Sequence, residues 1–304
     1  HGNGMGNTIS LIEASASTDP LGAAQAGATG SSSPVTVTGL TNGTSYTAQV
    51  WGINDYGNGP LSASTSSFTP FLPTPGIDFD GTNDYLLRSS DFTGNTDSKT
   101  FTFSAWVWFT DATDSFRLYS LDGNQTYFML TDNTVDINGG NSSDSNILSV
   151  QGTHNSLPIE TWNHILISFD MANTSNRYIY FNDVNETSNF TFATYTNDSI
   201  DFTRNAHSIV AATGGTGLDE TRIAGVYLDY TFRDLTTTSN RRLFIDADGL
   251  YVTPPTGSIM NVTMNTVASA GTNSGTGGNF TLNGTVAKSG RNALQYNPAA
   301  CEFD

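Results

Sequence analysis

Closely spaced aspartates are the first residues in this chain that could carry out chemistry. Asp78 and Asp80 are two positions apart, as are Asp246 and Asp248. A glycosidase needs two carboxyl groups about 5.5 Å apart for retention, or up to about 9.5 Å apart for inversion. Both aspartate pairs lie in glycine-containing stretches, where aspartate commonly accepts hydrogen bonds from its own backbone. We therefore expect structural turns at both places rather than a catalytic pair.

The remaining residue types of catalytic sites are scattered along the chain. No two glutamates lie two or four positions apart, and the single cysteine, Cys301, excludes an intrachain disulfide and a cysteine-based zinc site. The histidines are too far apart in sequence for a zinc-binding pair; they are His1, His154, His164 and His207. The sequence therefore predicts no catalytic residue. Reducing-sugar release that is lost when Asp78 or Asp246 is replaced would revive an enzymatic hypothesis.

The same two aspartate turns are the plausible places for a metal ion. Asp78, Asp80, Asn83 and Asp84 offer carboxylate and amide oxygens in one short stretch, and calcium prefers several oxygen ligands from a compact loop. The spacing does not match the twelve-residue loop of an EF-hand. Calcium is thus the only cofactor that we consider, and a turn without metal is the alternative.

Two tryptophans are the candidate ligand-binding residues. In the expected strand 101–109 the odd positions are apolar and can fill the space between two sheets. Trp106 and Trp108 then lie on the opposite face, where their rings could stack on sugars. The alternative is that loops cover both rings as a secondary core, because buried tryptophan is common in packed β-proteins.

Composition limits the class of partner. The chain has 304 residues, 28 acidic against 11 basic side chains and a formal net charge of −17. Nucleic-acid binding requires clustered basic residues, and the longest basic run here is Arg241-Arg242. No stretch approaches the roughly 20 apolar residues of a membrane span. We expect no nucleic-acid partner and no membrane insertion.

The pattern of short β-branched and aromatic runs between turn residues predicts an all-β fold. Residues 235–244 are the exception, where positions 236–239 could cap a short helix. Pro70, Pro73 and Pro75 predict an extended linker at 70–76. We therefore predict a first domain at 1–69, a second at 77–287 and a C-terminal tail at 288–304.

The first domain resembles the second half of a fibronectin type III domain. The resemblance lies in an expected strand at 34–40, a turn at 41–44, a strand at 45–53 and the motif Asn54-Asp-Tyr-Gly-Asn-Gly-Pro60. It implies a structural role for Tyr46 as the tyrosine corner. The pattern enters at the third strand of such a sandwich. The two missing strands would come from upstream sequence or from a neighbouring subunit by strand addition.

The second domain resembles a concanavalin A-like, laminin-G-like jelly roll. The segments that carry this resemblance are 78–86, 99–109, 160–170 and 177–183, in that order. Later segments, at 223–229, 240–246, 255–257 and 273–284, are similar to the version found in tailed-bacteriophage virion proteins. The resemblance implies structural roles for Trp162 and His164. The paired-glutamate strand of related glucanases is absent.

Composition and strand pattern indicate an exposed, acidic, two-domain, all-β protein. The resemblance to virion proteins implies a non-enzymatic structural or appendage protein at a virion surface, which could also recognise host glycans. Its partners would be other copies of itself, other virion or surface proteins, and cell-surface glycans. The alternative is a secreted prokaryotic adhesin or filament subunit, also extracellular, assembled by strand completion between neighbours. A genomic context of capsid and tail genes would favour the first hypothesis, and an upstream secretion signal would favour the second.

Overall fold

A computed structural model describes residues 11–18, 24–30, 37, 45–55, 57–67, 75–110, 115–124, 126–131, 134–153, 157–247 and 249–292. The chain divides into a first unit that ends at Pro73 and a second unit from Thr74 to Tyr296. This division falls inside the predicted linker, residues 70–76. In the described residues, no helix has the length and apolar character needed to cross a membrane.

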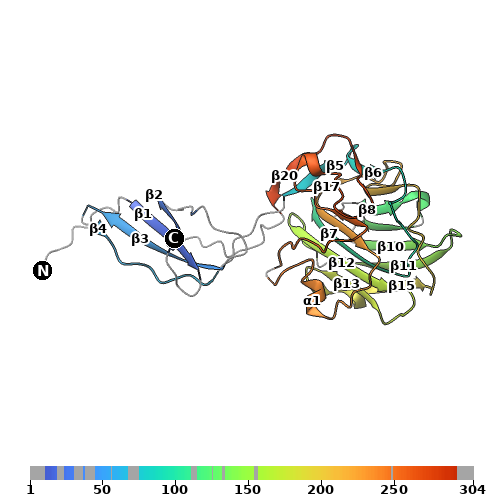
Figure 1. Cartoon of the computed structure of the whole chain (residues 1–304), viewed down its shortest axis with the longest axis horizontal. Helices are drawn as coiled ribbons and strands as arrows, with labels where there is room; N and C mark the ends of the chain where they lie inside the picture. The colour runs from blue at the N-terminus through green and yellow to red at the C-terminus, as the bar shows by residue number, and fades with distance from the viewer. Residues whose placement is uncertain are drawn as a thin grey trace. The chain divides into compact units, whose positions relative to one another are not determined.

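The described part of the first unit is one antiparallel sheet. Its strands are β1 (Leu11–Thr18), β2 (Ala24–Gly30), β3 (Tyr46–Asn54) and β4 (Gly57–Asn58), in the spatial order β2-β1-β3-β4 (Figure 1). Strand β3 corresponds to the strand expected at 45–53, and Tyr46 at its start is 3% exposed. The strand expected at 34–40, except Val37, and the turn at 41–44 lie outside the described residues.

The second unit is built from two antiparallel sheets, which we call sheet I and sheet II. In the described residues sheet I has the order β15 (Phe190–Tyr195), β11 (Asn146–Thr153), β10 (Thr134–Gly140), β9 (Tyr127–Thr131), β8 (Phe116–Leu121), β16 (His207–Val210), β6 (Tyr85–Arg88) and β19 (Thr281–Asn283). Sheet II has the order β14 (Val184–Asn185), β13 (Arg177–Phe181), β12 (Trp162–Asp170), β7 (Thr100–Phe109), β17 (Glu220–Asp229), β5 (Pro75–Asp80) and β20 (Ala287–Asn292), with β18 (Met260–Val262) paired to β17.

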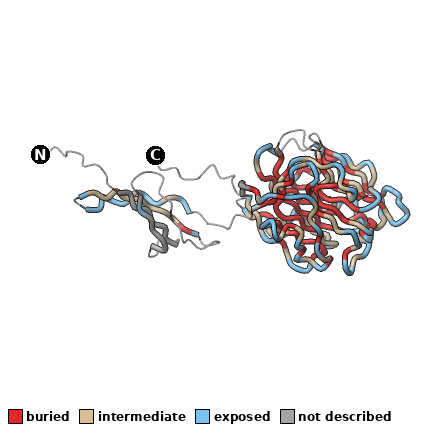
Figure 2. Tube along the Cα trace, turned by 90° about the horizontal axis from the view of Figure 1, so that it is seen from above, coloured by how far each residue is buried: buried red, intermediate tan, exposed pale blue. Residues whose placement is uncertain are grey.

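The main core lies between the two sheets, and Figure 2 shows the buried residues concentrated inside this unit. The predicted alternation in β7 is confirmed, because its odd positions belong to the main core. Phe101 and Phe103 of sheet II contact Phe128 of sheet I, with ring centroids 5.8 and 4.4 Å apart. The period-2 pattern of β7 therefore sets which face of sheet II is buried against sheet I.

Residues 235–251 contribute to two smaller cores on the other face of sheet II. Phe244 and Leu235 pack with Tyr227, while Ile245 packs with Trp106 and Trp108. The helix expected at 235–244 is shorter, α1 (Thr238–Arg241), and its N-cap residue Thr237 makes no side-chain capping bond. The described 3-10 turns are η1 (Asp122–Asn124), η2 (Thr187–Asn189) and η3 (Val267–Ser269).

The predicted boundaries of the second domain shift slightly at both ends. Strand β5 begins at Pro75, inside the stretch expected to be linker, and β20 continues to Asn292, past the expected end at 287. Both shifts have one cause, because β20 pairs with β5 at this edge of sheet II. The first and last strands of the unit therefore hold each other in place.

Candidate functional site

Trp106 and Trp108 do not form an open stacking surface. They are 3% and 4% exposed and pack with Trp162, Ile245 and Tyr251. The prediction that these rings bind sugars is therefore corrected. Residues of segment 235–251 cover both rings, which form the secondary core that was the alternative. The sequence could not show this, because the covering segment lies more than a hundred positions further along the chain.

The expected calcium ligands act as acceptors for the local backbone. Asp80 Oδ1 accepts the N–H of Thr82 at 2.8 Å, and Asp84 Oδ1 accepts the N–H of Thr285 at 2.7 Å. Asp78 forms an ion pair with Arg222, and Asp84 is 1% exposed. In the described residues no group of three or more His, Cys, Asp or Glu side chains could hold a metal ion. The N–H of Asn83 also donates to Asp80 Oδ1. These contacts are typical of a structural turn. Calcium binding stays a prediction.

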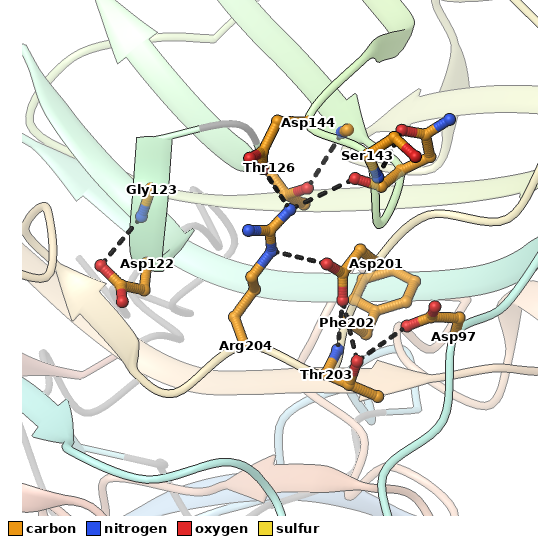
Figure 3. Close-up of polar contacts among 12 residues, drawn as sticks. Asp97, Asp122, Gly123, Thr126, Ser143, Asp144, Asp201, Phe202, Thr203 and Arg204 are labelled. Carbon is orange, nitrogen blue, oxygen red and sulfur yellow. Dashed lines mark hydrogen bonds and ion pairs between the residues drawn. The ribbon is translucent and has the colours of Figure 1, made fainter.

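The second aspartate pair also lies in a turn. Asp246 Oδ1 accepts the N–H of Leu250 at 2.8 Å, and Asp248 lies outside the described residues. A different pair, which sequence spacing did not suggest, meets at Thr203 (Figure 3). The Thr203 hydroxyl contacts Asp97 at 3.1 Å and Asp201 at 2.9 Å. Burial, and secondarily the charge of Asp201, raises the pKa of Asp97.

Asp201 is nonetheless committed to its own loop. Its Oδ1 accepts the N–H of Thr203 at 3.0 Å, and its Oδ2 pairs with Arg204 Nε at 2.8 Å. Arg204 also reaches Asp144 at 2.7 Å, which ties the loop after β15 to the β10–β11 turn (Figure 3). With both oxygens used and 6% of the residue exposed, Asp201 links loops and is a poor acid or base for a substrate.

The two described histidines are packed side chains. His164 Nε2 contacts Ser104 Oγ at 2.9 Å, and the ring stacks on Trp106. His207 Nδ1 contacts the Tyr119 hydroxyl at 2.9 Å. Burial lowers the pKa of His164 to about 3 and that of His207 to about 4, with Asp91 partly opposing the second shift. Both rings are therefore neutral near pH 7, which fits the structural role expected for His164.

A shallow cavity opens where the chain crosses from sheet II to sheet I. Strands β13 and β14 form the end of sheet II, and β15 is the end strand of sheet I. The cavity has a volume of about 530 Å³. We call it the edge pocket, and it is lined by Arg177, Asn185, Thr187, Ser188, Phe190 and Phe192.

The polar wall of the edge pocket is held by local hydrogen bonds. Thr187 Oγ1 accepts the N–H of Ile179 at 2.9 Å, and Asn185 Oδ1 accepts the N–H of Thr187 at 3.0 Å. The N–H of Glu186 donates to the carbonyl of Ile179 at 2.9 Å. These bonds fix the crossing segment against β13, so the amide and hydroxyl groups of this wall have defined positions.

The apolar wall consists of aromatic side chains from β15. Phe190 packs edge to face on Phe181 with ring centroids 5.9 Å apart, and Phe192 does the same on Phe169 at 5.8 Å. Gly152 of β11 permits this packing. A Cβ at position 152 would lie 2.5 Å from the Phe190 ring. A glycine in the neighbouring strand therefore lets Phe190 lie across β11.

Arg177 forms the charged corner of the edge pocket. Its guanidinium carbon lies 4.0 Å from the ring centroid of Phe192 and 5.4 Å from that of Tyr195. Arginine stacked on an aromatic ring keeps the N–H groups at its edge available for in-plane hydrogen bonds. The edge pocket thus combines an aromatic wall, amide and hydroxyl groups, and one guanidinium.

Sequence reasoning missed the edge pocket, because its residues belong to two different sheets. The available signal was the polar segment 185–189 directly before the alternating aromatics Phe190 and Phe192. That pattern indicates a strand after a loop. It does not reveal that Arg177 reaches the same place, which depends on where β14 ends and β15 begins.

Residues 80–229 match the family described as the Concanavalin A-like lectin/glucanases superfamily. No curated protein matches the chain.

Among solved structures, a Bacteroides ovatus ATCC 8483 protein, provisionally described as carbohydrate binding, is 16% identical and has a TM-score of 0.48 over 94% of this chain and 90% of that chain. Domains LG4-5 of the mouse laminin alpha1 chain are 8% identical, with a TM-score of 0.38 over 76% of this chain and 82% of that chain. The binding domain of botulinum neurotoxin serotype G is 13% identical, with a TM-score of 0.37 over 66% of this chain and 51% of that chain. From the family match and the two packed antiparallel sheets we conclude that the second unit is a concanavalin A-like, laminin-G-like jelly roll.

Proposed function

We propose that this protein is a non-enzymatic recognition protein whose jelly roll binds a glycan in the edge pocket. The observation that carries the proposal is the composition of that pocket. Small-molecule sites are typically cavities of about 300–1,000 Å³ with an apolar wall and a few placed polar groups. A sugar offers hydroxyls for Asn185 and Ser188, and apolar C–H groups for the aromatic wall. The match to a family that includes lectins supports the same class of ligand.

The setting we propose is an extracellular or virion surface. The acidic composition, with 28 acidic and 11 basic residues, supports a solubilised, exposed protein. The resemblance of the later jelly-roll segments to virion proteins favours an appendage such as a tail, fibre or capsid-surface subunit. A secreted prokaryotic adhesin or filament subunit is the alternative.

The first unit would supply the assembly contact. Its strand order β2-β1-β3-β4 supports the fibronectin type III resemblance, because the third strand of such a sandwich lies beside the sixth, with the seventh next to that. On this assignment β1 is the third strand, and the first two strands, which belong to the opposing sheet, are not among the described residues. We propose that a neighbouring copy or upstream sequence provides them, since an uncovered sheet face and edge are unfavourable in water.

Glycan-array binding by the full chain tests the proposed function. Ser188 is exposed and lines the edge pocket, so Ser188→Trp should fill the cavity and abolish binding of every glycan that the wild type retains. Ser90→Trp is the matched control, since Ser90 is also exposed and follows β6 near the other end of sheet I. Absence of binding by the wild type, or equal binding by Ser188→Trp, would overturn the proposal.

A further inference from the structure

Arg177 differs from most arginines of the jelly roll in its partners. Five arginines in the described residues form ion pairs with carboxylates; they are Arg204, Arg222, Arg233, Arg241 and Arg242. No ion pair in the described part of the chain involves Arg177. Its contacts there are the two aromatic rings. In a chain with a net charge of −17, a half-buried guanidinium without a carboxylate at a pocket wall calls for an explanation.

The carboxylates near the edge pocket are already engaged. Asp170 accepts the N–H of Ala172 at 3.0 Å and the side-chain amide of Asn176 at 3.1 Å. Glu186 is 8% exposed and accepts the side-chain amide of Asn189. Asp183 lies between two arginines, Arg241 and Arg242. Neutral amide donors thus bind Asp170 and Glu186, two arginines pair with Asp183, and none of these three carboxylates forms an ion pair with Arg177.

Stacking on Phe192 also restricts the orientation of the guanidinium. A planar guanidinium presents a fork of N–H donors that matches two oxygens of one anionic group. The aromatic ring shields one face of Arg177 from water, which strengthens an interaction made at its edge. A carboxylate or a sulfate group can accept two N–H bonds from this fork, whereas a neutral sugar hydroxyl offers a single oxygen.

We propose that the edge pocket selects acidic saccharides, with Arg177 as the donor to their carboxylate or sulfate oxygens. This inference rests on the proposed glycan-binding function and specifies the ligand class of the same site. The hydroxyl and amide groups of the polar wall would contact the sugar ring. Long-range repulsion by the acidic chain would be largely screened in physiological salt, where the Debye length is about 8 Å.

Matched saccharides that differ only in the acidic group test the inference. The full chain is titrated at physiological salt with lactose, 3′-sialyllactose and 3′-sulfolactose, and an array supplies uronate oligosaccharides with their carboxyl-reduced forms. We expect the wild type to bind the acidic member of a pair about tenfold more tightly. Comparing the affinities for 3′-sialyllactose and 3′-sulfolactose shows whether the pocket prefers a carboxylate or a sulfate group.

Arg177→Gln should remove this preference, so that the acidic and the neutral member of a pair bind with similar affinity. The control is Arg117→Gln, because Arg117 also stacks on a ring, that of Tyr127 at 4.6 Å, and lies outside the edge pocket. This control should keep the preference, although it removes the same charge. Binding of neutral glycans that Ser188→Trp abolishes, with no acidic preference, would overturn the inference and leave the proposed function standing. Absence of binding to any glycan would overturn both.

Discussion

At the residue scale, burial determines the state of the titratable side chains. His164 and His207 are 1% and 0% exposed and neutral at pH 7. Asp84 and Asp201, the most buried of the aspartates described above, accept hydrogen bonds from the backbone. The turn role of Asp80 was predictable from its local pattern, and the packing role of His164 was implied by the jelly-roll resemblance. Cover of Trp106 by a loop was one of the two readings of the sequence, but the local pattern could not identify the covering segment.

We predict that the jelly roll loses stability as the pH falls from 7 to 5. The folded pKa of each buried histidine lies below the unfolded value of about 6.5, so only the unfolded state gains a proton in this range. The loss begins near pH 6.5 and continues until the folded pKa values, about 4 for His207 and about 3 for His164, are reached. Each histidine should lower the free energy of unfolding by about 2 kcal/mol at pH 5.

Urea denaturation at pH 7 and pH 5 measures this loss. A His164→Asn variant is the control, because it should show about half of the pH dependence whatever its own stability at pH 7. Equal free energies of unfolding at both pH values would contradict the neutral, buried state of the two rings.

At the scale of elements, the crossing from sheet II to sheet I creates the edge pocket. The alternation of β7 was predictable from nine consecutive residues, 101–109, because strand periodicity is local. The contact between Arg177 and Phe192 was not predictable from the sequence. It depends on β13 and β15 lying at the same side of two different sheets. The packing of residues 235–251 on sheet II was also not predictable. The sequence pattern predicted a short helix in this segment but not where the segment lies in the fold.

Gly152→Ala tests whether β11 positions the aromatic wall. The new Cβ would lie 2.5 Å from the Phe190 ring, so we expect a loss of about 1–3 kcal/mol in the free energy of unfolding and weaker glycan binding. Gly214→Ala is the control, since nothing lies within 4 Å of a Cβ there. Thermal or urea unfolding measures the free energy of unfolding, and saccharide titration measures the affinity for glycan. Wild-type stability and binding in Gly152→Ala would show that Phe190 does not need this space.

At the scale of the whole molecule, the chain divides into two units, and the hydrophobic clusters of the described residues lie in the second unit. The second unit, Thr74–Tyr296, closes on itself through the pairing of β5 with β20. We predict that a fragment of residues 74–296 melts at the same temperature as the jelly-roll transition of the full chain. Scanning calorimetry of both proteins measures this. A fragment that fails to fold would show that the jelly roll needs the first unit.

Assembly is also a property of the whole molecule. If a neighbouring copy completes the first unit, the full chain should self-associate, and residues 74–296 should remain monomeric. Size-exclusion chromatography with light scattering distinguishes the two states, and limited proteolysis shows whether residues 1–70 become resistant in the assembly. A stable, monodisperse full-length monomer would contradict completion by a neighbouring copy.

The most direct test of the central claim is hydrogen–deuterium exchange of the full chain with and without an acidic saccharide that it binds. We predict slower exchange in residues 177–192, which carry β13, β14, η2 and the start of β15. Slower exchange confined to other segments, such as the aspartate turn at 78–84, would show that glycan recognition does not take place in the edge pocket.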